Sequence, residues 1–93
     1  MRIIGYIDHP EWKITLFKMD DKFSVKFEKP GFEQTFKIRQ SEAIPDENAL
    51  RKLINPDFLA AVHKQFDQMA LVIKSALNQR ETDREEDEFP EII

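Results

Sequence analysis

Few residues of this chain have types and spacings that suit catalysis or metal binding. The two histidines, His9 and His63, have no histidine or cysteine partner at the spacing of a metal site, and the sequence contains no cysteine. His9 precedes Pro10 in a short polar segment, and His63 lies beside the apolar stripe of a predicted helix. We interpret both as structural or solvated residues, and predict no metal site and no cofactor.

The remaining polar residues also lack the arrangement of a catalytic site. Asp20 and Asp21 occupy a predicted turn, and most other acids fall in the C-terminal run "DREEDE". A general acid or base needs a fixed position and a tuned pKa, which such runs do not provide. The serines have no Gly-x-Ser-x-Gly context, and two glycines are too few for a phosphate-binding loop. We therefore predict no catalytic residues and a protein that is not an enzyme.

Length and composition fit a single small globular domain. The chain has 93 residues, of which 41% are apolar and 34% charged. The N-terminal segment "MRIIGYIDHPEW" lacks the pattern of a signal peptide, and no apolar stretch is long enough to span a bilayer. Together with the absence of cysteine, these features lead us to expect a cytoplasmic protein.

Charge is distributed unevenly along the chain. Residues 1–40 carry eight basic and six acidic side chains, whereas residues 41–93 carry six basic and twelve acidic ones. The net charge is −4, which argues against tight non-specific binding of nucleic acid. The sequence thus indicates a mildly basic N-terminal half and an acidic C-terminal half.

Four runs within the first forty residues have the alternating pattern of antiparallel strands. They read "RIIGYI", "WKITLFKM", "KFSVKFE" and "FEQTFKIR", with short connections between them. Alternation with a period of two places one face of each strand on a core and the other in water. We predict a four-stranded antiparallel meander over about residues 2–39. Its predicted inner face consists of Ile14, Leu16, Phe23, Val25, Phe27, Phe36 and Ile38.

The second half is predicted to supply the helices that cover this sheet. A short helix is expected at about residues 46–54 and a long C-terminal helix at about 56–80. Asn55 suits the N-cap of the long helix, and Pro56 suits its first position. Apolar residues recur from Leu59 to Leu77 at intervals of three and four, which forms one stripe. The predicted fold is α+β, with a domain of residues 1–80 and an acidic, mobile tail of residues 81–93.

The outer face of the sheet is a candidate binding surface. Its candidate residues are Lys13, Phe17, Lys26, Lys37 and Arg39. Basic side chains around an aromatic ring on an open sheet bind single-stranded nucleic acid by stacking and phosphate attraction. The same pattern also fits ordinary solvated positions of strands. The order of four meander strands and a helix over residues 1–80 resembles the repeats of the purine-rich-element binding proteins, and this resemblance implies single-strand binding through the sheet.

Two further segments are candidates for protein contacts. Leu71 and Val72 add apolar surface beside the main stripe of the long helix, and we take them as candidate contacts of a homodimer. Phe89, Ile92 and Ile93 end the acidic tail, which resembles in type the C-terminal tips of bacterial single-strand binding proteins. They are candidates for docking on a partner or on the chain's own domain. The leading hypothesis is a small non-enzymatic module that binds protein; the alternative is single-stranded nucleic-acid binding.

Overall fold

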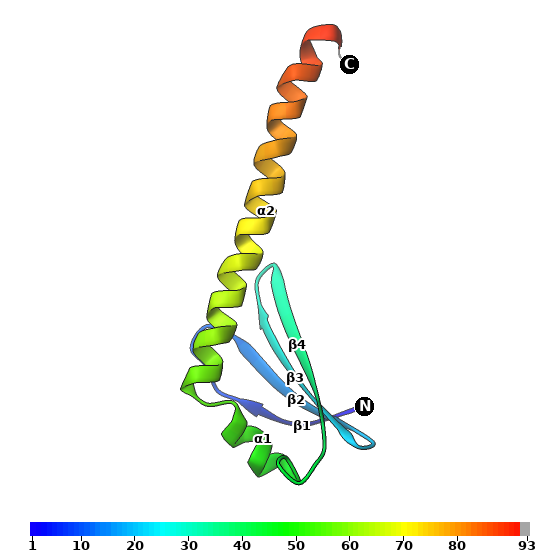
Figure 1. The fold of residues 1–93 in the computed structure, drawn as a ribbon, viewed down its shortest axis with the longest axis vertical. Coiled ribbons are helices and arrows are strands. Elements are labelled where there is room, and N and C mark those ends of the chain that lie inside the picture. Colours follow the sequence, from blue (N-terminus) through cyan, green and yellow to red (C-terminus); the bar gives the residue numbers. More distant parts are fainter. Residues whose placement is uncertain (92–93) are drawn as a thin grey trace. The chain divides into compact units, whose positions relative to one another are not determined.

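In the computed structural model, an antiparallel sheet of four strands precedes two helices (Figure 1). The structure describes the backbone of residues 1–91 and the side chains of residues 1–81. The strands are β1 (Arg2–Ile7), β2 (Lys13–Met19), β3 (Lys22–Lys29) and β4 (Phe32–Arg39), and they pair in chain order. The helices are α1 (Glu47–Leu53) and α2 (Pro56–Glu91). The predicted α+β fold class, with its meander sheet and its short and long helices, is confirmed.

The chain divides into two compact units, Met1–His63 and Lys64–Ile93. The first holds the sheet, α1 and the start of α2, and the described part of the second, residues 64–91, is the rest of α2. α2 extends to Glu91, beyond the predicted end near residue 80. The predicted boundary between a domain of residues 1–80 and a tail of residues 81–93 stays a prediction.

Two-residue turns close the second and third hairpins. Asp20 and Asp21 connect β2 to β3, and Asp20 adopts a φ of 54°. Pro30 and Gly31 connect β3 to β4, and Gly31 adopts a φ of 86°. Aspartate tolerates positive φ better than most residues and glycine tolerates it freely, so both turns have the residue types that their geometry requires.

The inner face of the sheet forms the core of the first unit. Ile14, Leu16, Phe23, Val25 and Phe27 are at most 3% exposed, as the alternation predicted. Phe36 and Ile38 belong to the same face but are half-buried, because β4 lies at the edge of the sheet. Full burial of such side chains contributes about 1.5–3 kcal/mol each, which makes this face the main source of stability.

The residues that cover this face come from α1, from its C-cap residue Ile54 and from the first two turns of α2. Leu50 and Ile54 are buried, and the Phe58 ring lies 5.9 Å from Phe27 and 5.3 Å from Phe36, measured between ring centroids. Both helices begin with a capping side chain. Asp46 accepts a hydrogen bond from the Ala49 backbone N–H, and Asn55 accepts one from the Phe58 N–H, both at 2.9 Å.

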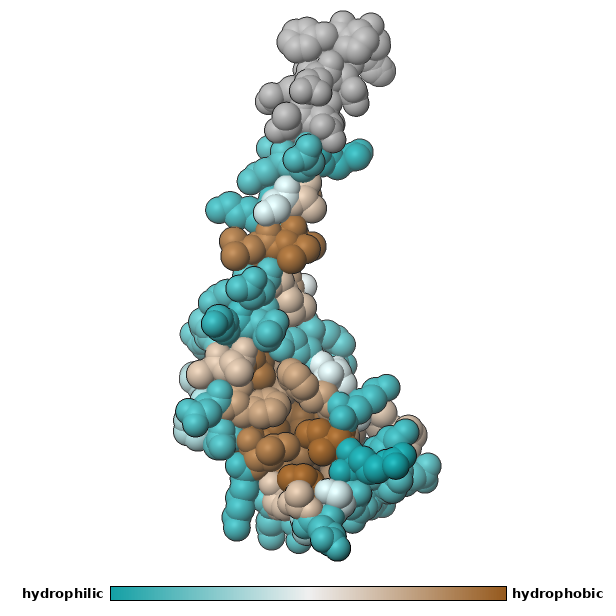
Figure 2. All heavy atoms as spheres, in the orientation of Figure 1, coloured by the Kyte–Doolittle hydropathy of each residue, from teal (hydrophilic) through white to brown (hydrophobic). Residues whose placement is uncertain are grey.

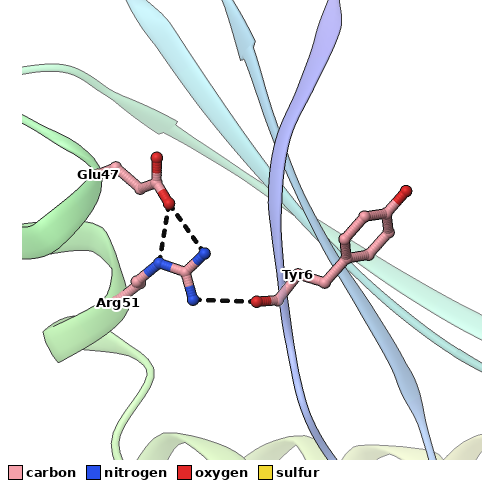
Figure 3. Close-up of polar contacts among 3 residues, drawn as sticks. All are labelled: Tyr6, Glu47 and Arg51. Atoms are coloured by element: carbon pink, nitrogen blue, oxygen red, sulfur yellow. Dashed lines mark hydrogen bonds and ion pairs between the residues drawn. The ribbon is translucent and has the colours of Figure 1, made fainter.

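The open edge of β1 is covered by an arginine of α1 (Figure 3). Arg51 Nη1 donates a hydrogen bond of 2.9 Å to the Tyr6 carbonyl, and Glu47 holds the same guanidinium in an ion pair of 2.8 Å. Gly5 lies directly beneath this pair, where a Cβ would overlap with Arg51 Nη2. A carbonyl that is already hydrogen-bonded is not available to another strand, so Arg51 opposes strand addition at Tyr6.

We predict that Gly5 and Arg51 are energetically coupled. Arg51→Ala removes the bond to Tyr6 and the half-exposed ion pair, at a cost of about 1 kcal/mol in unfolding free energy. Gly5→Ala displaces the flexible guanidinium and costs a similar amount. In the Arg51→Ala background the methyl group has room, so Gly5→Ala should then be nearly neutral. Urea unfolding of the four proteins measures the coupling. Exposed Lys52→Ala is the control, and additive effects would contradict the prediction.

Candidate interaction surfaces

The outer face of the sheet carries aromatic and apolar side chains on β1 and β2, and basic ones on β3 and β4. The strand register aligns Ile3, Phe17, Ser24 and Lys37 in one row, and Tyr6, Thr15, Lys26 and Thr35 in the next. Flanking rows hold Met19, Lys22 and Arg39 on one side and Lys13, Glu28 and Glu33 on the other. Thr15 and Ser24 are 3% and 7% exposed, so these two small residues lie below their larger neighbours.

All five sheet residues predicted as a binding surface belong to this outer face, but they are not equivalent. Lys26 Nζ lies 3.8 Å from a Glu28 carboxylate oxygen and 3.9 Å from a Glu33 oxygen, so its charge is locally balanced. Arg39 pairs with Asp21 at 3.8 Å, with both side chains well exposed. No ion pair involves Lys13 or Lys37 within the part of the chain whose side chains are described. Lys37 is therefore the outer-face cation best placed to meet an anion near Phe17.

Alternation along the sequence did not identify two outer-face residues of β1, Ile3 and Tyr6, because this strand contains a bulge. Ile3 pairs with Phe17, whereas Gly5 pairs with Leu16, so Ile4 is an extra residue that reverses the alternation. As a result Tyr6 lies opposite Thr15 on the outer face, and the residue is 53% exposed. Ile3 is 52% exposed on the same face. The glycine beside the tyrosine in "RIIGYI" is the sequence signal that could have indicated a bulge.

The second candidate surface lies on α2. Leu71, Val72, Ile73 and Leu77 are 50–66% exposed, and Figure 2 shows apolar side chains as a brown band on this part of the helix. Helical spacing places Met69, Val72, Ile73 and Leu77 on one side, and Leu71 about 200° around the axis from Met69. The two predicted dimer contacts, Leu71 and Val72, are thus both exposed but do not belong to the same stripe. The candidate tail residues Phe89, Ile92 and Ile93 have side chains outside the described part of the chain.

His9 has a structural role in the turn between β1 and β2. Its Nδ1 accepts hydrogen bonds from the Glu11 and Trp12 backbone N–H groups at 3.1 and 3.2 Å. Its ring stacks on Trp12 with a centroid distance of 4.2 Å and an interplanar angle of 9°. His63 is a near neighbour of the same tryptophan, at 6.0 Å between ring centroids. Among the described residues, no group of three or more His, Asp or Glu side chains is arranged to hold a metal ion.

A shallow hollow opens between this turn and the outer face. Tyr6, His9 and Lys13 are among its lining residues, so it continues the exposed surface of Tyr6 toward the turn.

No helix in the described part of the chain is both long and apolar enough to cross a membrane. Comparison with known proteins finds no matching family model, no similar curated protein and no similar solved structure.

We predict that His9 stabilises the first unit through both its nitrogen and its ring. His9→Ala removes an acceptor for two backbone N–H groups and a stacked ring, and should lower the unfolding free energy by about 1–2 kcal/mol. His9→Asn keeps an acceptor near the position of Nδ1 but loses the stack, so it should recover part of the loss. Thermal and urea unfolding of both variants test this, and equal losses would show that the hydrogen bonds contribute nothing.

Proposed function

We propose that this protein is a non-enzymatic interaction module that binds protein through the apolar stripe of α2. We define this stripe as the C-terminal part of the predicted apolar stripe, Met69, Ile73, Ala76 and Leu77, together with Val72, which borders it. The observation that carries the proposal is the exposure of Val72, Ile73 and Leu77, at 66%, 50% and 58%. Single exposed apolar residues are common on protein surfaces, but several large ones together on one side of a helix are typical of interaction sites.

The burial of α2 changes along its length in a way that supports this proposal. Val62 and Phe66 are buried, Met69 is half-buried, and Ile73 and Leu77 are exposed, although all follow the same spacing of three and four. A helix normally loses its apolar stripe where its burial ends. Here the stripe continues for about two further turns, and a partner that covers it explains why these residues are apolar.

A second copy of the chain is the partner that we propose. Two-fold symmetric pairs are the commonest soluble assemblies, and such an interface uses the same patch on both chains. From Met69 to Leu77 the stripe is about 12 Å long at 1.5 Å per residue. That length is short compared with a standard interface of about 20–30 residues a side, so the expected dimer is weak, with a Kd in the micromolar range.

We predict that Val72→Ser combined with Ile73→Ser weakens self-association at least tenfold. Sedimentation velocity between about 1 µM and 1 mM should follow the wild-type chain from its 11.0 kDa monomer to a dimer. The double substitution removes two apolar contacts per chain, each worth about 1.5–3 kcal/mol when buried, and should weaken the dimer at least tenfold. Both side chains are at least half exposed, so the folded monomer should lose little stability.

Leu71→Ser is the matched control, because Leu71 is equally apolar and 56% exposed but lies on another side of the helix. It should leave the dimer unchanged. A wild-type chain that stays monomeric at about 1 mM would refute the second-copy proposal, and a dimer sensitive to Leu71→Ser but not to the double substitution would refute the choice of stripe.

The wider functional setting is part of the same proposal. The lack of any catalytic grouping in the sequence supports a role in binding, and the lack of cysteine supports a location in the reducing cytoplasm. The acidic C-terminal segment with its apolar tip is proposed as a second contact for protein partners.

A further inference from the structure

We propose that the outer face of the sheet is a binding site for single-stranded nucleic acid, with Tyr6 and Phe17 as stacking platforms. This site belongs to the first unit and shares no residue with the stripe of α2, so it does not depend on the dimer. Three features of the outer face carry the proposal: the spacing of the two rings, the adjoining cations and the local balance of charge.

The first feature is the spacing of the rings. Tyr6 lies opposite Thr15, and Phe17 is two residues further along β2, so the rings are diagonal neighbours on adjacent strands. Such positions are about 7–8 Å apart, more than twice the rise of about 3.4 Å between stacked bases. Each ring can therefore receive its own base only if the bases are separated from each other. A single strand allows this, whereas a duplex keeps its bases stacked and paired.

Both rings are accessible from the outer side. Tyr6 is 53% exposed, and its side chain points away from Arg51 and Glu47 (Figure 3). Phe17 is half-buried, and the two residues beside it in its row are Ile3 and the small, buried Ser24. The small side chain of Ser24 does not rise beside the ring of Phe17, so a flat base has room to stack there.

The second feature is the position of the cations. Lys37 ends the row that contains Phe17 and Ser24, and Lys22 and Arg39 occupy the adjoining row on β3 and β4. Bases on β1 and β2 would place the attached phosphates over β3 and β4, next to these cations. Lys26 contributes least, because two carboxylates, Glu28 and Glu33, lie beside it, whereas Arg39 has a single well-exposed partner, Asp21, that a phosphate can replace.

The third feature is the local charge. The rows of the outer face contain five basic and two acidic side chains, a net charge of +3. The unit Met1–His63 as a whole has ten basic and ten acidic side chains, and the net −4 of the chain arises in residues 64–93. The first unit is therefore neutral, with its positive charge concentrated on the outer face and most of its acids in turns and helices.

Fluorescence anisotropy with a labelled single-stranded DNA oligonucleotide of mixed sequence tests the site in the full chain. Binding is expected at about 50 mM salt. If Lys22, Lys37 and Arg39 each contact one phosphate, affinity should fall about 20-fold by about 200 mM, at a slope of about −0.7 per contact. Tyr6→Ala should weaken binding about fivefold or more, whereas Tyr6→Phe should retain it. Phe17→Ala should act like Tyr6→Ala, and Lys37→Gln should also reduce the salt slope by about 0.7.

Matched controls come from outside the outer face. Phe32 is half-buried on β4 with Lys29 over its ring, at 6.0 Å, but belongs to the inner-face positions. Phe32→Ala should therefore leave affinity unchanged, as should Lys52→Gln on α1. Circular dichroism confirms that each variant is folded, and exposed Tyr6 keeps the test usable if Phe17→Ala is unstable.

Three results would overturn the proposal. The first is no binding at about 50 mM salt, where counterion release most favours it. The second is equal affinity for the matching duplex, or affinity that Tyr6→Ala leaves unchanged. Either result would show that binding depends on general attraction to phosphate and not on base stacking. The third is a loss of self-association in Tyr6→Ala without any loss of nucleic-acid binding, which would assign the face to a protein contact.

Discussion

The packing of Phe27 is the interaction on which the rest of the first unit depends. Its side chain is fully buried, and its ring lies within 6.2 Å of the rings of Trp12, Phe36 and Phe58, measured between centroids. These three come from the turn before β2, from β4 and from α2, so one side chain joins the turn, the sheet and the helical cover. Aromatic rings at such distances prefer defined edge or offset geometries, which fixes the position of the cover on the sheet.

The helical cover packs on the inner face of the sheet only, and the outer face stays largely exposed. The inner face carries the apolar residues that α1 and the start of α2 cover, whereas the outer face keeps several large side chains exposed. An open sheet face is normally polar. The exposed Ile3, Tyr6 and Met19 depart from that expectation, and they do so on the two strands next to the basic ones. The same asymmetry that stabilises the fold thus leaves a mixed aromatic and basic surface available for binding.

Alternation in the sequence was sufficient to predict the sheet wherever pairing is regular. The residues of β2, β3 and β4 face the sides that their period of two predicted, and the capping role of Asn55 followed from local chemistry. β1 could not be assigned in the same way, because one extra residue at Ile4 reverses the alternation and a bulge is decided by pairing with β2. The contact between Arg51 and the Tyr6 carbonyl joins residues 45 positions apart, and nothing local in the sequence encodes it.

The candidate sites were predictable to the same extent as the strands that carry them. Alternation along the strands placed Lys13, Phe17, Lys26, Lys37 and Arg39 on one face together with Glu28 and Glu33, and the structure shows that both carboxylates lie within 4 Å of Lys26 Nζ. The structure therefore distinguishes cations that the sequence left equivalent, since Lys26 is paired with carboxylates and Lys37 lies in the row of Phe17. It also adds Tyr6, which turns one isolated ring into a pair. In the proposed single-strand site, the bulge in β1 supplies the second stacking platform, which the alternation along the sequence did not indicate.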